Sequence, residues 1–289
     1  MEFPPYFADA EASFSNADFI IFGVPFDKTS TFRHGTDKSP MKIRQASWNF
    51  ETFNIKTGLD LRDIKFHDYG DLSVQSFDSN KMINHVRDFA SKIIKNKKFP
   101  IAIGGEHSIS SGLIQAFSKD IAVLSLDAHL DFREQYENNI NNHACVIKRI
   151  SDHIKIKNIA VIGYRSAEKE EFEDAEKLNL FKKDIFSIRE KGFSKVLKQT
   201  KDYLKNRKIY LTLDMDVIDP AYAPGVTTPE PFGLTPSEVF VFIETFSSQL
   251  VGFDLVEVCP EYDFGETSLL AAKIIRFLIE RVWFYKIKR

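Results

Sequence analysis

The 289-residue sequence lacks the features that define several large protein classes. Its two cysteines, Cys145 and Cys259, form no CxxC pair and are too few for a disulfide framework. No apolar run approaches the ~20 residues that cross a bilayer. The first residues, Met1-Glu2-Phe3-Pro4-Pro5, have neither the basic region nor the apolar stretch of a signal peptide. We therefore expect a soluble protein of a reducing cytoplasm, with no membrane partner.

An excess of charge of either sign is also missing. The chain has 39 Lys plus Arg and 41 Asp plus Glu, which gives a formal charge of −2. That balance provides no basic field for phosphates, so we expect no nucleic-acid partner. Low-complexity segments, internal repeats and Pro/Gly/Ser-rich linkers are absent, whereas 43% of the residues are hydrophobic. These features favour one large domain that spans residues 1–289.

Six short apolar runs, rich in β-branched residues, predict strands that are buried on both faces. Longer stretches with helical spacing lie between them, of which residues 81–96 and 193–203 are the clearest. Alternating strands and helices predict an α/β fold of three layers, α/β/α, around a mainly parallel sheet. The predicted strands are residues 20–24, 101–104, 122–126, 159–163, 209–213 and 251–256.

The sequence also predicts where two helices begin and what structure the last residues form. Ser39-Pro40 and Thr235-Pro236 each place a hydroxyl at the N-cap and proline in the first turn. Glu238 completes a capping box with Thr235. The last residues, 276–289, alternate apolar and basic side chains, which predicts an edge strand or an amphipathic end.

Ligand-type side chains follow several of these predicted strands. In parallel α/β sheets, ligands bind beyond the carboxyl ends of the strands, so these residues are expected to meet in one site. In an extended segment, residues at i, i+2 and i+4 point to the same face; Asp127, His129 and Asp131 have this spacing, and Asp214 and Asp216 repeat its i, i+2 step. The segments are 104–108 (GGEHS), 127–131 (DAHLD), 214–216 (DMD) and Glu257.

The residue types in this set indicate a pair of divalent cations. Four aspartates crowded together repel one another, and two divalent ions would neutralise them. Oxygen-rich ligation with some imidazole and no thiolate favours Mn²⁺, although Co²⁺, Zn²⁺ or Fe²⁺ could compete. The proposed ligands are His107, Asp127, His129, Asp131, Asp214 and Asp216.

Each motif, taken alone, is also compatible with another structure or function. The segment 104–108 could be a tight turn with a buried histidine. Residues 213–217 (LDMDV) also resemble the nucleophile strand of aspartate-phosphorylated phosphatases or the DxD of glycosyltransferases. A phosphatase, however, would leave His107, His129 and Glu257 without a role. The conjunction of ligand-type residues at several strand ends favours the two-metal site.

In order, the segments GGEHS, SLDAHLD, TLDMDVIDP and DLVEVCPEYD resemble the signature blocks of the ureohydrolases, the family of arginases and agmatinases. The resemblance extends over roughly residues 20–265 and implies the arginase-like fold. It also implies that Asp127 and Asp214 bridge the two Mn²⁺ ions. His107 and Asp131 would complete one ion's ligands, and His129 and Asp216 the other's.

The same resemblance implies a hydrolytic mechanism and three catalytic residues. A metal-bridging hydroxide would attack the guanidinium carbon that Glu257 binds, while Asp131 passes a proton to the leaving amine. His143 would contact substrate near the site entrance and exchange protons with solvent, a role that an unperturbed pKa near 6.5 would suit. Family members also imply a homo-oligomer, a trimer or a hexamer.

Residues 132–142 bear on the choice of substrate. They lack the Ser-Gly-Asn-x-His-Gly run typical of arginases and look like the corresponding agmatinase segment, which favours agmatine and the products putrescine and urea. The four asparagines of this segment serve turns or bind a carboxylate. A guanidinobutyrase, an arginase, a formimidoylglutamase-like enzyme and a non-catalytic relative are the alternatives.

Overall fold

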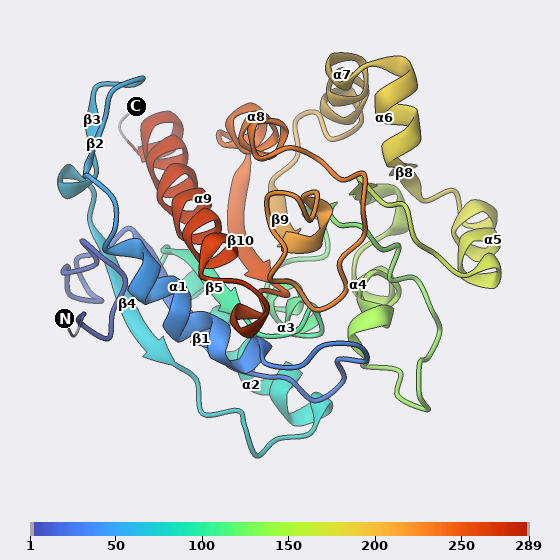
Figure 1. Cartoon of the computed structure of the whole chain (residues 1–289), viewed down its shortest axis with the longest axis horizontal. Helices are drawn as coiled ribbons and strands as arrows, with labels where there is room; N and C mark the ends of the chain where they lie inside the picture. Colours follow the sequence, from blue (N-terminus) through green and yellow to red (C-terminus); the bar gives the residue numbers. More distant parts are fainter. Residues whose placement is uncertain (1–2, 288–289) are drawn as a thin grey trace.

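The protein is built on one eight-stranded sheet, seen in a computed structural model that describes residues 3–287 (Figure 1). The strand order is β4-β1-β5-β10-β9-β6-β7-β8, and every pair of neighbours is parallel. The strands are β1 (Phe19–Val24), β4 (Phe66–Asp71), β5 (Phe99–Gly104), β6 (Ala122–Leu126), β7 (Ile159–Ile162), β8 (Phe181–Lys183), β9 (Ile209–Asp214) and β10 (Leu250–Val256). A separate antiparallel hairpin joins β2 (Phe53–Asn54) and β3 (Leu59–Asp60).

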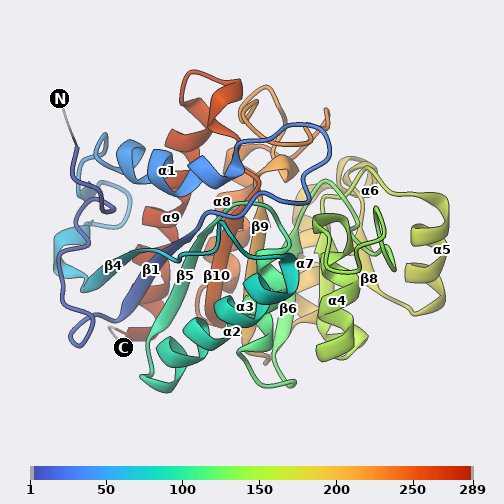
Figure 2. The same cartoon turned by 90° about the horizontal axis from the view of Figure 1, so that it is seen from below.

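Helices cover both faces of the sheet, so the three-layer prediction is confirmed (Figure 2). One face packs against α1 (Ser39–Ser47), α6 (Ile185–Lys191), α7 (Phe193–Tyr203), α8 (Pro236–Phe246) and α9 (Glu266–Val282). The other face packs against α2 (Ser79–Lys95), α3 (Ile109–Gln115), α4 (Val146–His153) and α5 (Lys169–Lys177).

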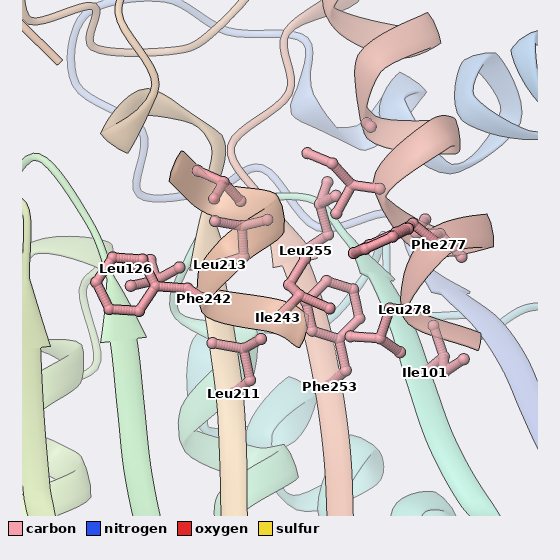
Figure 3. Packing of buried hydrophobic residues seen from close by; sticks show 14 of the residues in the cluster. Ile101, Leu126, Leu211, Leu213, Phe242, Ile243, Phe253, Leu255, Phe277 and Leu278 are labelled. Carbon is pink, nitrogen blue, oxygen red and sulfur yellow. The ribbon is translucent and has the colours of Figure 1, made fainter. Parts of the chain in front are cut away.

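Successive residues of the inner strands point to opposite layers. In β1, Phe19 and Ile21 pack in the cluster beneath α1 and α9, whereas Ile20 and Phe22 pack in the cluster beneath α2. All four side chains are fully buried. This two-sided burial explains why the strand sequences are almost continuously apolar rather than alternating. Figure 3 shows the first cluster, where Ile243 of α8 and Leu278 of α9 lie beside Phe253 of β10.

All six predicted strands are present, and α2 and α7 match the two predicted helices. The edge strands β4 (FHDYGD) and β8 (FKK) are absent from the prediction because their polar residues give no apolar run. Of the two alternatives for residues 276–289, the edge strand is wrong, because α9 continues to Val282 and a π-helical turn, Trp283–Ile287, follows it. Residues 288–289 of that segment lie outside the described residues.

The two predicted helix starts have different outcomes. Thr235 caps α8 with the full capping box that it forms with Glu238, as expected. Ser39 is not an N-cap, because a 3₁₀ turn, Thr36–Lys38, leads directly into α1. The Ser39 hydroxyl instead donates a hydrogen bond to the carbonyl of Gly104, which fastens α1 to the carboxyl end of β5.

Gly105, just after β5, brings two loops into close contact. A Cβ at this position would lie 2.0 Å from the carbonyl oxygen of Phe26, in the loop after β1. Only glycine fits, and the approach sets the position of the next residues, Glu106 and His107. Across residues 3–287, the helices are too short or too polar to traverse a bilayer.

Phe253 and Phe264 offer a matched test of the core. Phe253 is fully buried in β10, whereas Phe264 is fully exposed before α9. Phe253→Ala is expected to lower the free energy of unfolding by about 3–5 kcal/mol, because it leaves a cavity between sheet and helices. Phe264→Ala should change it by less than about 0.5 kcal/mol. Urea denaturation measures both, and equal midpoints for the two variants would contradict the packing described.

Candidate metal centre and active site

The predicted site residues come together at the carboxyl ends of four neighbouring central strands. In sheet order these strands are β5, β10, β9 and β6, and they are followed by His107, Glu257, the Asp214–Asp216 pair and Asp127. Because all the strands are parallel, their ends share one edge of the sheet. Side chains separated by up to 150 residues therefore face one another across a few ångströms.

His107 lies at the centre of the first group of side chains. Its Nδ1 is 3.1 Å from Asp127 Oδ2, 3.1 Å from Asp131 Oδ2 and 3.4 Å from Asp214 Oδ2. All four side chains are more than nine-tenths buried. Buried negative charge of this density requires a positive partner, and His107, Asp127 and Asp214 are placed so that they could hold a metal ion.

His129 anchors a second group beside the first. Its Nδ1 is 2.8 Å from Asp216 Oδ2 and 3.8 Å from Asp127 Oδ1. Asp127 therefore presents one oxygen to each group, as a bridging carboxylate would. Potential ligand atoms lie within 4.8 Å of one another in each of the sets His107–Asp127–Asp214 and Asp127–His129–Asp216.

Asp127 also supplies the observation that tests whether the residues fit divalent ions. Its Oδ2 is fully buried and accepts no hydrogen bond from any residue between 3 and 287. A buried carboxylate oxygen without a donor is strongly unfavourable, and a cation would satisfy it. The oxygen-rich donor set with two imidazoles suits Mn²⁺ and similar ions.

The route by which these residues converge differs from the extended geometry predicted from their spacing. β6 ends at Leu126, and Asp131 has a left-handed backbone with φ of 48°. β9 ends at Asp214, and Asp216 lies in a 3₁₀ turn, Met215–Val217. Tight turns, rather than one face of a strand, aim the carboxylates. The prediction that the ligand segments are extended is therefore wrong, but the predicted meeting of these residues in one site is observed.

A buried hydrogen-bond chain holds the far side of His107. Its Nε2 is 3.0 Å from Thr212 Oγ1, whose hydroxyl donates to Asp254 Oδ1 at 2.7 Å. Asp254 also accepts hydrogen bonds from Tyr210 at 2.7 Å and Ser110 at 3.0 Å. These partners fix the ring so that Nδ1 faces the carboxylates. Sequence reasoning missed them, although polar residues inside the apolar runs of β9 and β10 were the available signal.

Glu257 closes the floor of the cleft. Its Oε1 accepts a hydrogen bond from the backbone N–H of His107 at 2.5 Å, and its Oε2 accepts one from the Thr227 hydroxyl. Its backbone has a φ of 65°, which non-glycine residues adopt only where the surroundings enforce it. Burial raises the pKa of this carboxyl to about 8, although Thr227 and His107 partly oppose the shift.

His143 also lines this cleft and is held in place through Thr29. Its backbone N–H donates to Thr29 Oγ1 at 2.9 Å, and the Thr29 hydroxyl donates to the buried Glu106 at 2.6 Å. Burial, reinforced by the nearby His129, lowers the pKa of His143 to about 4. The expected unperturbed pKa is therefore wrong, and the ring is neutral at pH 7.

The cleft above these residues has a volume of about 210 Å³ and admits only a small molecule. Its walls include Arg133 and Tyr136 from the 132–142 segment, but none of that segment's asparagines. Two of those asparagines serve turns instead: Asn142 accepts a hydrogen bond from the N–H of Ala144, and Asn139 accepts one from the N–H of Asn141. Sequence reasoning missed Arg133, Tyr136 and Glu230 as lining residues.

Comparison with known proteins identifies the family. Residues 17–280 match the sequence model of the arginase family. The chain belongs to the arginase family. The arginase-like fold and the resemblance stated above are thereby confirmed. Members of this family are hydrolases that act on guanidino C–N bonds, and this chain is one of them.

Three arginase-family proteins illustrate the similarity. An agmatinase of Bacillus anthracis is 34% identical over 282 residues, which cover 94% of each chain. An N(1)-aminopropylagmatine ureohydrolase of Thermococcus kodakarensis is 36% identical over 267 residues, 91% of this chain and 90% of that one. The crystal structure of the agmatine ureohydrolase of Thermoplasma volcanium matches with a TM-score of 0.94 and 40% identity, over 99% of this chain and 96% of that chain.

In the absence of metal ions, the crowding of buried carboxylates in this arginase-family site determines which groups bind protons. Burial, followed by the charge of Asp127, raises the pKa of Asp131 to about 7. Burial alone would lower the pKa of His129, but the charge of Asp216 raises it to about 10. Protons thus take the place that cations would occupy.

These shifts give the metal-free protein a definite pH dependence. Raised carboxyl pKa values destabilise the fold as pH rises from about 4 through the values near 7 and 8 of Asp131 and Glu257. The raised His129 pKa contributes stability that is complete below about pH 6.5 and is lost as pH rises through about 10. Both effects lower stability across neutral pH.

We therefore expect Mn²⁺ to raise the thermal midpoint more at about pH 8.5 than at about pH 6, because ions displace fewer protons at the higher pH. Differential scanning fluorimetry of chelator-treated and Mn²⁺-loaded protein measures the difference. Asp120→Asn, a substitution at an exposed loop residue before β6, is the control and should leave the pH trend unchanged. A Mn²⁺-induced shift that is the same at both pH values would contradict this account.

Proposed function

We propose that this chain is an agmatinase, which hydrolyses the guanidinium group of agmatine to putrescine and urea. The observation that carries the proposal is the cleft in which the carboxylate of Glu257 faces two histidine–aspartate groups joined by Asp127. The agmatinase and agmatine ureohydrolase relatives support the choice of substrate. We further propose that residues 1–289 act as one domain in the cytoplasm and, as the family resemblance implies, within a homo-oligomer.

In this proposal two divalent ions, Mn²⁺ in the first instance, occupy the two side-chain groups. When bound, they supply a water molecule whose pKa is lowered enough to provide hydroxide near neutral pH. Asp127 and Asp214 are the proposed shared ligands. The residues that would hold the ions are His107, Asp127, His129, Asp131, Asp214 and Asp216.

Glu257 binds and orients the guanidinium in the proposed reaction. Its two oxygens already accept hydrogen bonds from His107 N–H and Thr227, so the carboxylate has one fixed orientation. A guanidinium at this position provides the positive charge that favours the ionised carboxylate and brings the pKa of Glu257 down from about 8. This interaction thus holds the guanidinium carbon close to the two proposed ions.

Asp131 and His143 move protons in the proposed reaction. Asp131, as the family resemblance implies, would pass a proton from the attacking water to the leaving amine. His143, tied to Thr29, is the proposed residue that exchanges protons with solvent, although burial lowers its pKa to about 4 and so opposes its protonated form at pH 7.

Urea release is the direct test. Mn²⁺-loaded protein should release urea from agmatine, with little or none from arginine, 4-guanidinobutyrate or formimidoylglutamate, the last followed as formamide. Asp127→Asn should lose most of the activity and at least one equivalent of metal, measured by elemental analysis, because Asp127 is shared by both groups. N(1)-aminopropylagmatine belongs in the same panel. Two bound ions without urea from any guanidine would reject the proposal in favour of a formimino substrate or a non-catalytic role.

The role of Glu257 has its own test. Glu257→Gln should lower kcat/KM for agmatine by about 10- to 100-fold, the effect of removing a charge-assisted hydrogen bond of ~1.5–3 kcal/mol. Glu261→Gln is the matched control, since Glu261 is exposed and pairs with Lys38. Metal content, measured in parallel, should stay at the wild-type level. Equal kinetics for the two variants would contradict the assignment.

A further inference from the structure

Glu230 is a carboxylate of the cleft that the proposed reaction does not use. It follows Thr227-Thr228-Pro229, a segment that forms one wall of the cleft, and its side chain is 32% exposed. Among residues 3–287, no group donates a hydrogen bond to this carboxylate. The nearest basic atom is His129 Nε2 at 3.8 Å, which is beyond hydrogen-bond distance.

The other carboxylates that line the cleft each have a partner. Asp131, Asp214 and Asp216 face the proposed ions, and Glu257 faces the proposed guanidinium. Glu171 accepts hydrogen bonds from the N–H groups of Phe132 and Glu168 and lies 3.5 Å from Arg133 Nε. Glu230 is therefore the negative charge that remains, and the loaded cleft retains room for one more cation.

The position of Glu230 is fixed by its backbone. Arg165 donates hydrogen bonds to the carbonyl of Glu230 from both Nε, at 3.1 Å, and Nη2, at 2.5 Å. Because Arg165 binds only the backbone carbonyl of Glu230, the side chain stays available to a ligand while the wall is held in place. A group held in this way is preorganised to receive a ligand.

The distance between Glu257 and Glu230 along the cleft wall matches the length of a short substrate tail. Thr227 contacts Glu257, and Glu230 is three residues further on, so the chain spans at most about 10 Å between them. In agmatine, six covalent bonds of about 1.5 Å separate the guanidinium carbon from the terminal nitrogen. An extended tail from Glu257 therefore reaches the neighbourhood of Glu230.

From these observations we infer that Glu230 binds the distal ammonium group of the guanidine substrate and selects substrates with a cationic tail. The inference rests on the proposed function and assigns a specificity-determining residue to the same site. Glu230 compensates the charge of an ammonium that leaves bulk water for the cleft. A tail that ends in a carboxylate is repelled there, which disfavours 4-guanidinobutyrate.

Kinetics with paired substrates test the inference. n-Butylguanidine has the length of agmatine but no ammonium. Glu230→Gln should raise KM for agmatine by about 10- to 100-fold and leave kcat and the KM for n-butylguanidine within about twofold. Glu134→Gln is the charge-matched control, because Glu134 is exposed on the 132–142 segment and binds Lys148 and Arg149.

Metal content separates this role from an effect through His129. Wild type and Glu230→Gln should hold the same amount of Mn²⁺ by elemental analysis. A loss of Mn²⁺, an equal rise in KM for both guanidines, or an unchanged KM for agmatine would each overturn the inference.

The inference can fail independently of the proposed function. If the wild type releases no urea from any guanidine, the proposed function fails, and calorimetry then tests Glu230 without turnover. In that case Mn²⁺-loaded wild type should bind agmatine about 10- to 100-fold more tightly than n-butylguanidine, and Glu230→Gln should bind the two equally. Equal binding of the two compounds by the wild type would overturn the assignment of Glu230.

Discussion

Repulsion among buried carboxylates is the constraint on which the rest of this structure depends. Asp127, Asp131 and Asp214 present oxygens to a single nitrogen of His107 within 3.1–3.4 Å, in a region from which water is excluded. A protein interior tolerates such a cluster only when positive charge compensates it, as protons or as metal ions. The fold must therefore hold these groups together against their own electrostatics, and the parallel sheet does so by fixing the strand ends from which they project.

A layer of uncharged and acidic partners supports the cluster. Thr212 and Asp254 hold His107 from within the sheet, and Glu106 holds Thr29 and thereby His143. The first set of hydrogen bonds ties the segment after β5 to β9 and β10, and the second joins the segments that follow β5, β1 and β6, so displacement of one segment would break hydrogen bonds to another. The site residues thus have little freedom to move apart when protons leave, which is the preorganisation that binding of ions and catalysis require.

The sequence predicted the sheet and the convergence of the site better than its local geometry. Strands such as β6 are recognisable because two-sided burial demands unbroken apolar residues, whereas β4 and β8 lie at edges that tolerate polar ones. The ligand types at the strand ends identified the cluster, but the turn at Asp131, with its positive φ, left no signal in the residue types. The depressed pKa of His143 and the half-buried carboxylate of Glu230 depend on tertiary surroundings, which spacing along the chain does not encode.

Arg165 holds the wall of the cleft through backbone carbonyls and leaves the side chains of the wall available to substrate. Its guanidinium donates to the carbonyls of Glu230 and Pro231 on the wall and of Asp216 and Val217 at the metal end. Every residue type has a carbonyl, so replacing the wall's side chains leaves these hydrogen bonds in place. The wall is therefore a surface on which new substrate preferences can evolve by single substitutions, while the centre that performs the chemistry stays intact.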